Sequence, residues 1–76
     1  MLFRSRLLAA ETRAKVAEAI DKLPANQAAV IRLRDVEGWT AEEVRNALEL
    51  SEVNQRVLLH RARARVRTAL EEYIAP

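Results

Sequence analysis

Apolar residues recur at helical spacing in four segments of the chain, and few residues interrupt them. The first such segment covers residues 2–22 and carries Val16, Ala19 and Ile20 on one side. Pro24 suits the first turn of a helix and disfavours helix in the residue before it, so a second helix is predicted over 25–36. Gly38, just beyond it, is the natural helix stop.

Capping signals define the next two helices. Thr40 lies three residues before Glu43, which is the spacing of a capping box, and predicts a short helix over 41–48. Ser51 is the next N-cap candidate, and nothing interrupts the helical pattern from 52 to 73. A capped short helix, a link of about three residues and a longer helix predict a helix-turn-helix within an all-α, four-helix domain that spans 1–76.

The fourth helix has two contrasting faces. The face predicted to join the core carries Gln55, Leu59, Ala62, Val66, Leu70 and Tyr73. The opposite face carries Val53, Val57, His60 and Ala64, and its two borders carry Arg56, Arg63 and Arg67 on one side and Asn54 and Arg61 on the other. Exposed valines beside arginines favour burial by a partner, either thymine methyl groups or a protein.

Charge is distributed in two blocks. Residues 35–52 hold six acidic residues and one arginine, whereas residues 53–67 hold five arginines and no acid. Only Lys15 and Lys22 among the thirteen basic residues are lysine, and arginine suits bidentate contacts with phosphate and guanine. The second block therefore predicts an anionic partner.

Composition excludes several other functions. There is no Cys, one His and one Gly, so no thiolate zinc site, multi-histidine metal site or glycine-rich phosphate loop is expected. No nucleophile–base pair is visible, so we expect neither an enzyme nor a cofactor. No apolar run approaches a membrane span, and without a targeting signal the expected location is the cytoplasm.

The major groove of DNA admits one α-helix, and the fourth helix has the chemistry to enter it. Its outer positions suited to base edges are Val53, Asn54, Val57 and His60, and the cations suited to phosphates are Arg56, Arg61 and Arg63. Uncapped N–H groups near Thr40 and Ala41 are expected to accept a further phosphate.

The stretch AIDKLPANQAAVIRLRDVEGWTAEEVRNALELSEVNQRVLLHRARARVR resembles region four of bacterial sigma factors of the extracytoplasmic-function class. The matching residues are Leu23-Pro24, the run LRDVEGWTAEEV over 33–44, and the LSE and LLHRARARVR motifs within 50–67. They cover about fifty of the 76 residues, in order and at the family's spacing.

The resemblance implies a domain that binds the −35 promoter element of double-stranded DNA through its last helix. It also implies docking on the β flap of the RNA polymerase core, and capture by an anti-sigma factor. Carried over to this sequence, the base-facing positions are Glu52, Val53, Arg56 and Val57, and the phosphate-facing ones are Arg34, Thr40 and Arg61, followed by His60 and Arg63. Since nothing resembles a region-two domain, we expect the chain to be the C-terminal domain of a longer sigma factor.

Three positions depart from the family pattern. Glu49 stands where the turn has glycine, and a left-handed conformation there costs a non-glycine residue about 1–2 kcal/mol. Val53 replaces a small residue at the start of the recognition helix, and Gln55 replaces a core valine, so its amide needs a partner if buried. An altered base preference is expected. The alternative function is a helical protein-interaction module, whose basic helix binds an acidic partner or an anionic surface.

Overall fold

A computed structural model of the chain describes the backbone of residues 2–74 and the side chains of residues 10–73. Within that part all regular structure is helical: α1 (Leu2–Asp21), α2 (Ala25–Ile31), the π-helical turn η1 (Arg32–Val36), α3 (Ala41–Leu48) and α4 (Glu52–Ile74). The all-α class with a helix-turn-helix is confirmed, and the observed bounds lie within about a residue of the expected ones except in the second helix. Met1 and residues 75–76, part of the 1–76 domain prediction, lie outside the described residues.

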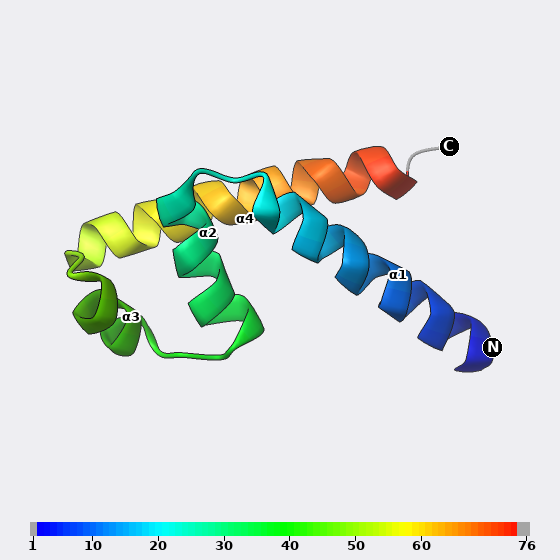
Figure 1. Cartoon of the computed structure of the whole chain (residues 1–76), viewed down its shortest axis with the longest axis horizontal. Coiled ribbons are helices and arrows are strands. Elements are labelled where there is room, and N and C mark those ends of the chain that lie inside the picture. Colours follow the sequence, from blue (N-terminus) through cyan, green and yellow to red (C-terminus); the bar gives the residue numbers. More distant parts are fainter. Residues whose placement is uncertain (1, 75–76) are drawn as a thin grey trace.

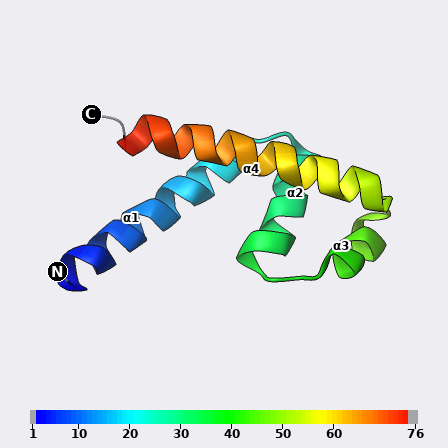
Figure 2. The same cartoon turned by 180° about the vertical axis from the view of Figure 1, so that it is seen from behind.

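Helix α4 is the scaffold on which the other helices are arranged. It runs along the long axis of a molecule that measures 42 × 22 × 16 Å (Figure 1). α2 crosses its middle, α3 lies beside its start, and α1 approaches its second half and then diverges from it toward the N-terminus, as the view from behind also shows (Figure 2). The first half of α4 is therefore the second helix of the helix-turn-helix.

The core draws on every α-helix. Its buried members are Ile20, Ala28, Val30, Ile31, Val44, Leu59, Ala62 and Val66, and Val30 and Val44 are fully enclosed. Four of the six positions predicted for the core face of α4 are buried, and Leu70 packs at the margin. Gln55 is one of these four, and among the described residues its Oε1 has no hydrogen-bond partner, which leaves the predicted need for a partner unmet.

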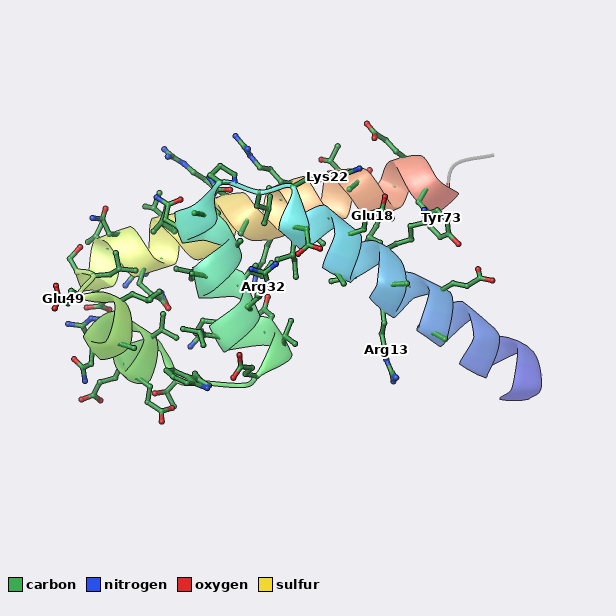
Figure 3. The ribbon with its side chains drawn as sticks, in the orientation of Figure 1. Arg13, Glu18, Lys22, Arg32, Glu49 and Tyr73 are labelled. Carbon is green, nitrogen blue, oxygen red and sulfur yellow. The ribbon has the colours of Figure 1, made fainter. Side chains whose placement is uncertain are left out.

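Tyr73 corrects the prediction for this face, because 41% of it is exposed. Its hydroxyl donates to Glu11 Oε2 at 2.9 Å, and Lys15 Nζ lies 4.9 Å from the ring centroid. The carboxylate of Glu11 favours the protonated phenol, so it raises the pKa of Tyr73 above its ordinary value. The ring thus links α1 to the end of α4 at the surface, where the two helices diverge (Figure 3).

The sequence predicted a second helix over 25–36, but α-helical geometry ends at Ile31. Its last turn widens into η1, and the N–H of Glu37 donates to the carbonyl of Arg32 at 2.9 Å, five residues back. Gly38 then adopts a positive φ of 77°, a conformation that glycine reaches without strain. Apolar periodicity marks a helix but does not distinguish i→i+4 from i→i+5 bonding, so the sequence could not reveal this turn.

The turn between α3 and α4 closes tightly despite the missing glycine. Glu49 lies at this turn (Figure 3) and takes the left-handed conformation, at φ 55° and ψ 48°. The N–H of Leu50 donates to the carbonyl of Arg45 at 2.9 Å. The N–H of Asn54 donates to Ser51 Oγ at 3.0 Å, which confirms Ser51 as the cap of α4. The turn therefore keeps the left-handed residue that the family's glycine would supply, and Glu49 bears the strain.

Replacing Glu49 with glycine is expected to stabilise the fold by about 0.5–1 kcal/mol. Relief of the left-handed strain contributes about 1–2 kcal/mol, and the greater freedom of glycine in the unfolded chain offsets part of it. Thermal unfolding monitored by circular dichroism should show a midpoint several degrees higher. Glu49→Ala, which keeps a Cβ, should not raise it, and an equal rise in both variants would contradict the assignment of strain.

Candidate nucleic-acid interface

The outward face of α4 is open to solvent over its first three turns. Val53 is 65% exposed, and Asn54, Val57, His60 and Arg61 are exposed beside it. These are the residues that the sequence assigned to base edges and phosphates, and the structure places them on one accessible surface at the end of the molecule formed by the helix-turn-helix. Apolar side chains in this position remain exposed unless a partner covers them.

Glu52 and Arg56 form an ion pair along one border of this face. Arg56 Nη2 donates to Glu52 Oε1 at 2.8 Å, and both side chains are largely exposed. The acid precedes the base by four residues, which is the more favourable order on a helix. The guanidinium is thus held close to the N-terminal end of α4.

Arg63 lies further along α4 and is engaged by the protein itself. Its Nε and Nη2 donate to the two carboxylate oxygens of Asp35 at 2.8 and 2.6 Å. The hydrogen bonds from Arg63 lower the pKa of Asp35, although burial opposes this shift, and the same bonds raise the pKa of Arg63. The pair links α4 to η1, so Arg63 helps to hold α4 in place.

The Asp35–Arg63 pair should make stability depend on pH at the acidic end. Because the pKa of Asp35 is lowered in the folded state, its stabilisation is complete above the unfolded pKa of about 3.9 and is lost as the pH falls through the folded value. Asp35 is 35% exposed and Arg63 49%, so solvent limits the contribution to about 0.5–1 kcal/mol.

Urea unfolding at pH 7 and pH 3 measures how much the Asp35–Arg63 pair contributes to stability at each pH. Asp35→Asn should cost about 0.5–1 kcal/mol at pH 7 and less at pH 3, where the wild-type pair is itself weakened. Glu37→Gln removes the same charge from a neighbouring exposed position and serves as the control. An equal cost of Asp35→Asn at both pH values would contradict the role of the ionised pair.

Arg34 and Thr40 hold the segment that leads into α3. Arg34 is half-buried, its Nη1 donates to the carbonyl of Trp39 at 3.5 Å, and within the described part its buried Nε has no partner. Thr40 forms the predicted capping box: its N–H donates to Glu43 Oε1 at 2.8 Å, and Glu43 N donates to Thr40 Oγ1 at 3.1 Å. These hydrogen bonds lower the pKa of Glu43.

The capping box limits the phosphate site expected near Thr40 and Ala41. As a capping box requires, the N–H of Thr40 donates to Glu43 Oε1, so this N–H is not available to a phosphate. A phosphate approaching this end of α3 meets that carboxylate, and only the remaining first-turn N–H groups and the Thr40 hydroxyl could donate to it.

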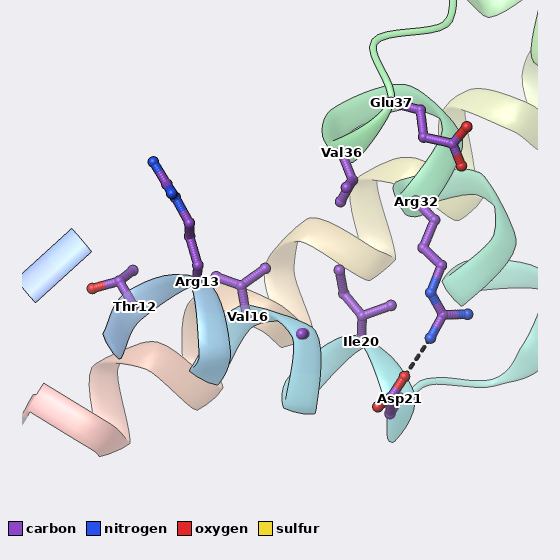
Figure 4. A pocket seen from close by; sticks show the side chains of 9 residues that line it. Thr12, Arg13, Val16, Ile20, Asp21, Arg32, Val36 and Glu37 are labelled. Carbon is purple, nitrogen blue, oxygen red and sulfur yellow. Dashed lines mark hydrogen bonds and ion pairs between the residues drawn. The ribbon is translucent and has the colours of Figure 1, made fainter. Parts of the chain in front are cut away.

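A second surface feature, which the sequence reasoning missed, lies between α1 and η1. A groove of about 400 Å³ is floored by Val16, Ile20 and Val36, with charged residues at its rim (Figure 4). An ion pair between Arg32 and Asp21 closes one end, and Val36 is 65% exposed. Val36, an apolar residue between Asp35 and Glu37 in the helix predicted over 25–36, was the available signal, but helical periodicity alone did not show that its side chain is exposed.

Comparison with known protein families matches residues 13–66 to the family described as Sigma-70, region 4. The matched segment contains α2, η1, α3, the C-terminal part of α1 (residues 13–21) and α4 as far as Val66, including the whole of the exposed face described above. No curated protein matches the chain. Within the described residues, none of the helices is both long enough and apolar enough to cross a membrane.

Proposed function

The chain belongs to the Sigma-70 region 4 family, whose members recognise promoter DNA and interact with RNA polymerase as parts of sigma factors, and from this premise we propose that it binds the −35 element of promoters of the extracytoplasmic-function class. One observation carries the proposal: the exposed face of α4 follows a capped α3 and a tight turn, within a stretch of five arginines and no acid over 53–67. That combination supplies base-reading positions and phosphate contacts together.

We assign the side chains of this surface to two roles. Glu52, Val53, Asn54, Arg56 and Val57 face bases, with the two valines contacting thymine methyl groups. Arg34, Thr40, His60 and Arg61 face phosphates. Arg63 contributes to a phosphate only by sharing its guanidinium with Asp35, so its main role is to hold α4 in place.

A DNA selection with the chain in its full-length sigma factor, bound to bacterial RNA polymerase core, tests the proposal. A single motif upstream of the start site should be enriched, and it should bind at least about 10³-fold better than random duplex. The −35 assignment would be overturned if no motif were enriched at the −35 position upstream of the start site. Equal binding to duplex DNA, acidic polypeptides and anionic vesicles would favour the interaction-module alternative.

We further propose that the groove between α1 and η1 receives a helix of the polymerase β flap. Its apolar floor and charged rim suit an amphipathic helix, whose apolar side would cover Val36. The groove is formed by α1 and η1, whereas the base-reading positions lie on α4, so one domain could hold polymerase and promoter together. An anti-sigma factor that covered the groove or the α4 face would block one of these contacts. Because promoter DNA and RNA polymerase are its proposed partners, we also propose that the chain acts in the cytoplasm.

Replacing Val36 with glutamate is expected to weaken binding to core polymerase by about 10-fold or more, because a charge would be buried in an apolar contact. Binding to promoter duplex should be unchanged. Ala25→Glu adds the same charge at an exposed site of α2 outside the groove and should affect neither partner. Fluorescence anisotropy with core enzyme and with duplex measures both. Equal polymerase affinities of the two variants would argue against the groove.

A further inference from the structure

We propose that Glu52 and Arg56 act as one base-reading unit, in which the carboxylate both holds the guanidinium and demands an amino group from the DNA. The inference rests on the proposed function, because it assigns a specificity to the same face of α4. It makes Glu52 a residue that rejects wrong sequences as well as one that positions its neighbour.

The geometry leaves Arg56 free to read a base while Glu52 holds it. Among the residues whose side chains are described, the guanidinium makes one hydrogen bond, in which Nη2 donates to Glu52 Oε1 at 2.8 Å. A guanidinium carries five N–H donors in a fixed plane, so a second pair remains for O6 and N7 of guanine. Anchoring one edge of the group limits the directions in which the other edge points, which reduces the entropy lost when the base contact forms.

The carboxylate itself is the more selective element. Glu52 lies in the first turn of α4 and is largely exposed, so the proposed function places it where the helix enters the major groove. A negative charge among phosphates is unfavourable, and losing its hydration adds to the cost. The base edges that offset this cost in the major groove are the amino groups N4 of cytosine and N6 of adenine. Sites without such a group at that position should therefore be penalised.

The helix spacing limits where the two bases can lie. Four residues of α-helix rise about 6 Å, and base pairs are about 3.4 Å apart along the duplex. Glu52 and Arg56 therefore address base pairs within about two steps of each other. The predicted signature is a guanine together with a nearby cytosine or adenine amino group, adjacent to thymines that contact Val53 and Val57.

A purely structural role for the pair is also physically reasonable. An acid in the first turn interacts favourably with the helix dipole, and a Glu–Arg pair four residues apart stabilises a helix slightly. If the pair had only that role, removing it would change the stability of the fold and would affect binding to every DNA sequence equally. Base-dependent effects therefore separate the two readings.

The test uses the 76-residue chain with the selected −35 duplex and a set of duplexes that each change one base pair, read by competition binding at constant salt. Wild type, Glu52→Ala, Arg56→Lys and the double variant are compared, with Glu71→Gln as a control that removes one acid near the far end of α4. Circular dichroism establishes that each variant is folded.

We expect Glu52→Ala to bind random duplex about 3- to 10-fold more tightly and to lose about 5- to 100-fold discrimination at one base pair. Arg56→Lys should lose discrimination at a neighbouring guanine, and the two effects should be non-additive. A uniform change over all duplexes in Glu52→Ala, as in Glu71→Gln, would overturn the inference while leaving the proposed function intact. Absence of any preference in the wild type would overturn both.

Discussion

Replacing Leu59 with alanine is expected to lower the free energy of unfolding by about 2–5 kcal/mol. Leu59 is only 5% exposed, and it lies on the core face of α4, the helix against which α1, α2 and α3 all pack. A chain of this length has a total stability of about 4–11 kcal/mol, so the loss is a large fraction of the whole. The outward face of α4 lies on the other side of the same helix turn, so we expect its side chains to lose their arrangement when the core is weakened.

Urea unfolding followed by circular dichroism measures this loss. Val53 lies on the same helix but is 65% exposed, so Val53→Ala serves as the control. The unfolding free energy of this variant should differ from that of the wild type by no more than about 0.5 kcal/mol. A loss below about 1 kcal/mol in Leu59→Ala would mean that the core is not shared by the four helices as described.

Local chemistry explains why the helix-turn-helix could be predicted from the sequence. The Thr40–Glu43 capping box and the Ser51 cap each involve residues three apart, and both formed as expected. Glu49 also took the left-handed conformation that the position requires, although it has a Cβ. Short-range hydrogen bonds of this kind depend little on the rest of the fold, so their sequence patterns are reliable.

Features that join distant parts of the chain could not be read in the same way. Asp35 and Arg63 are 28 residues apart, and Tyr73 and Glu11 are 62 apart. The helical wheel placed Tyr73 in the core because it assumes that one face stays covered along the whole helix, whereas α1 diverges from the end of α4. The groove at Val36 likewise depends on where α1 lies relative to η1.

The candidate site shows the same division. Which residues share the outer face of α4 follows from helical periodicity, and the structure exposes Val53, Val57 and Arg61 together. What each side chain is free to do depends on its neighbours: Arg56 is held by Glu52, and Arg63 by Asp35. Arginines that look equivalent in the sequence therefore differ in how far their guanidinium groups are free to contact a partner.

Arg61 is the arginine on which this distinction can be tested for DNA. Replacing it with alanine is expected to weaken duplex binding by about 10-fold or more, because a charge-assisted contact to phosphate is lost. The slope of log K against log salt should decrease in magnitude by about 0.9, the contribution of one phosphate. Anisotropy titrations of a labelled promoter duplex over a range of salt concentrations give both quantities.

Arg13→Ala supplies the matched control, since it removes the same charge from an exposed position on α1, a helix that carries none of the assigned DNA contacts (Figure 3). If attraction between net charges were all that mattered, both variants would weaken binding equally. If Arg61 contacts a phosphate, only its replacement changes the salt slope, because counterion release follows from close contact and not from charge screened beyond about 10 Å. An unchanged slope in Arg61→Ala would remove that residue from the interface and shift the phosphate contacts toward Arg34 and His60.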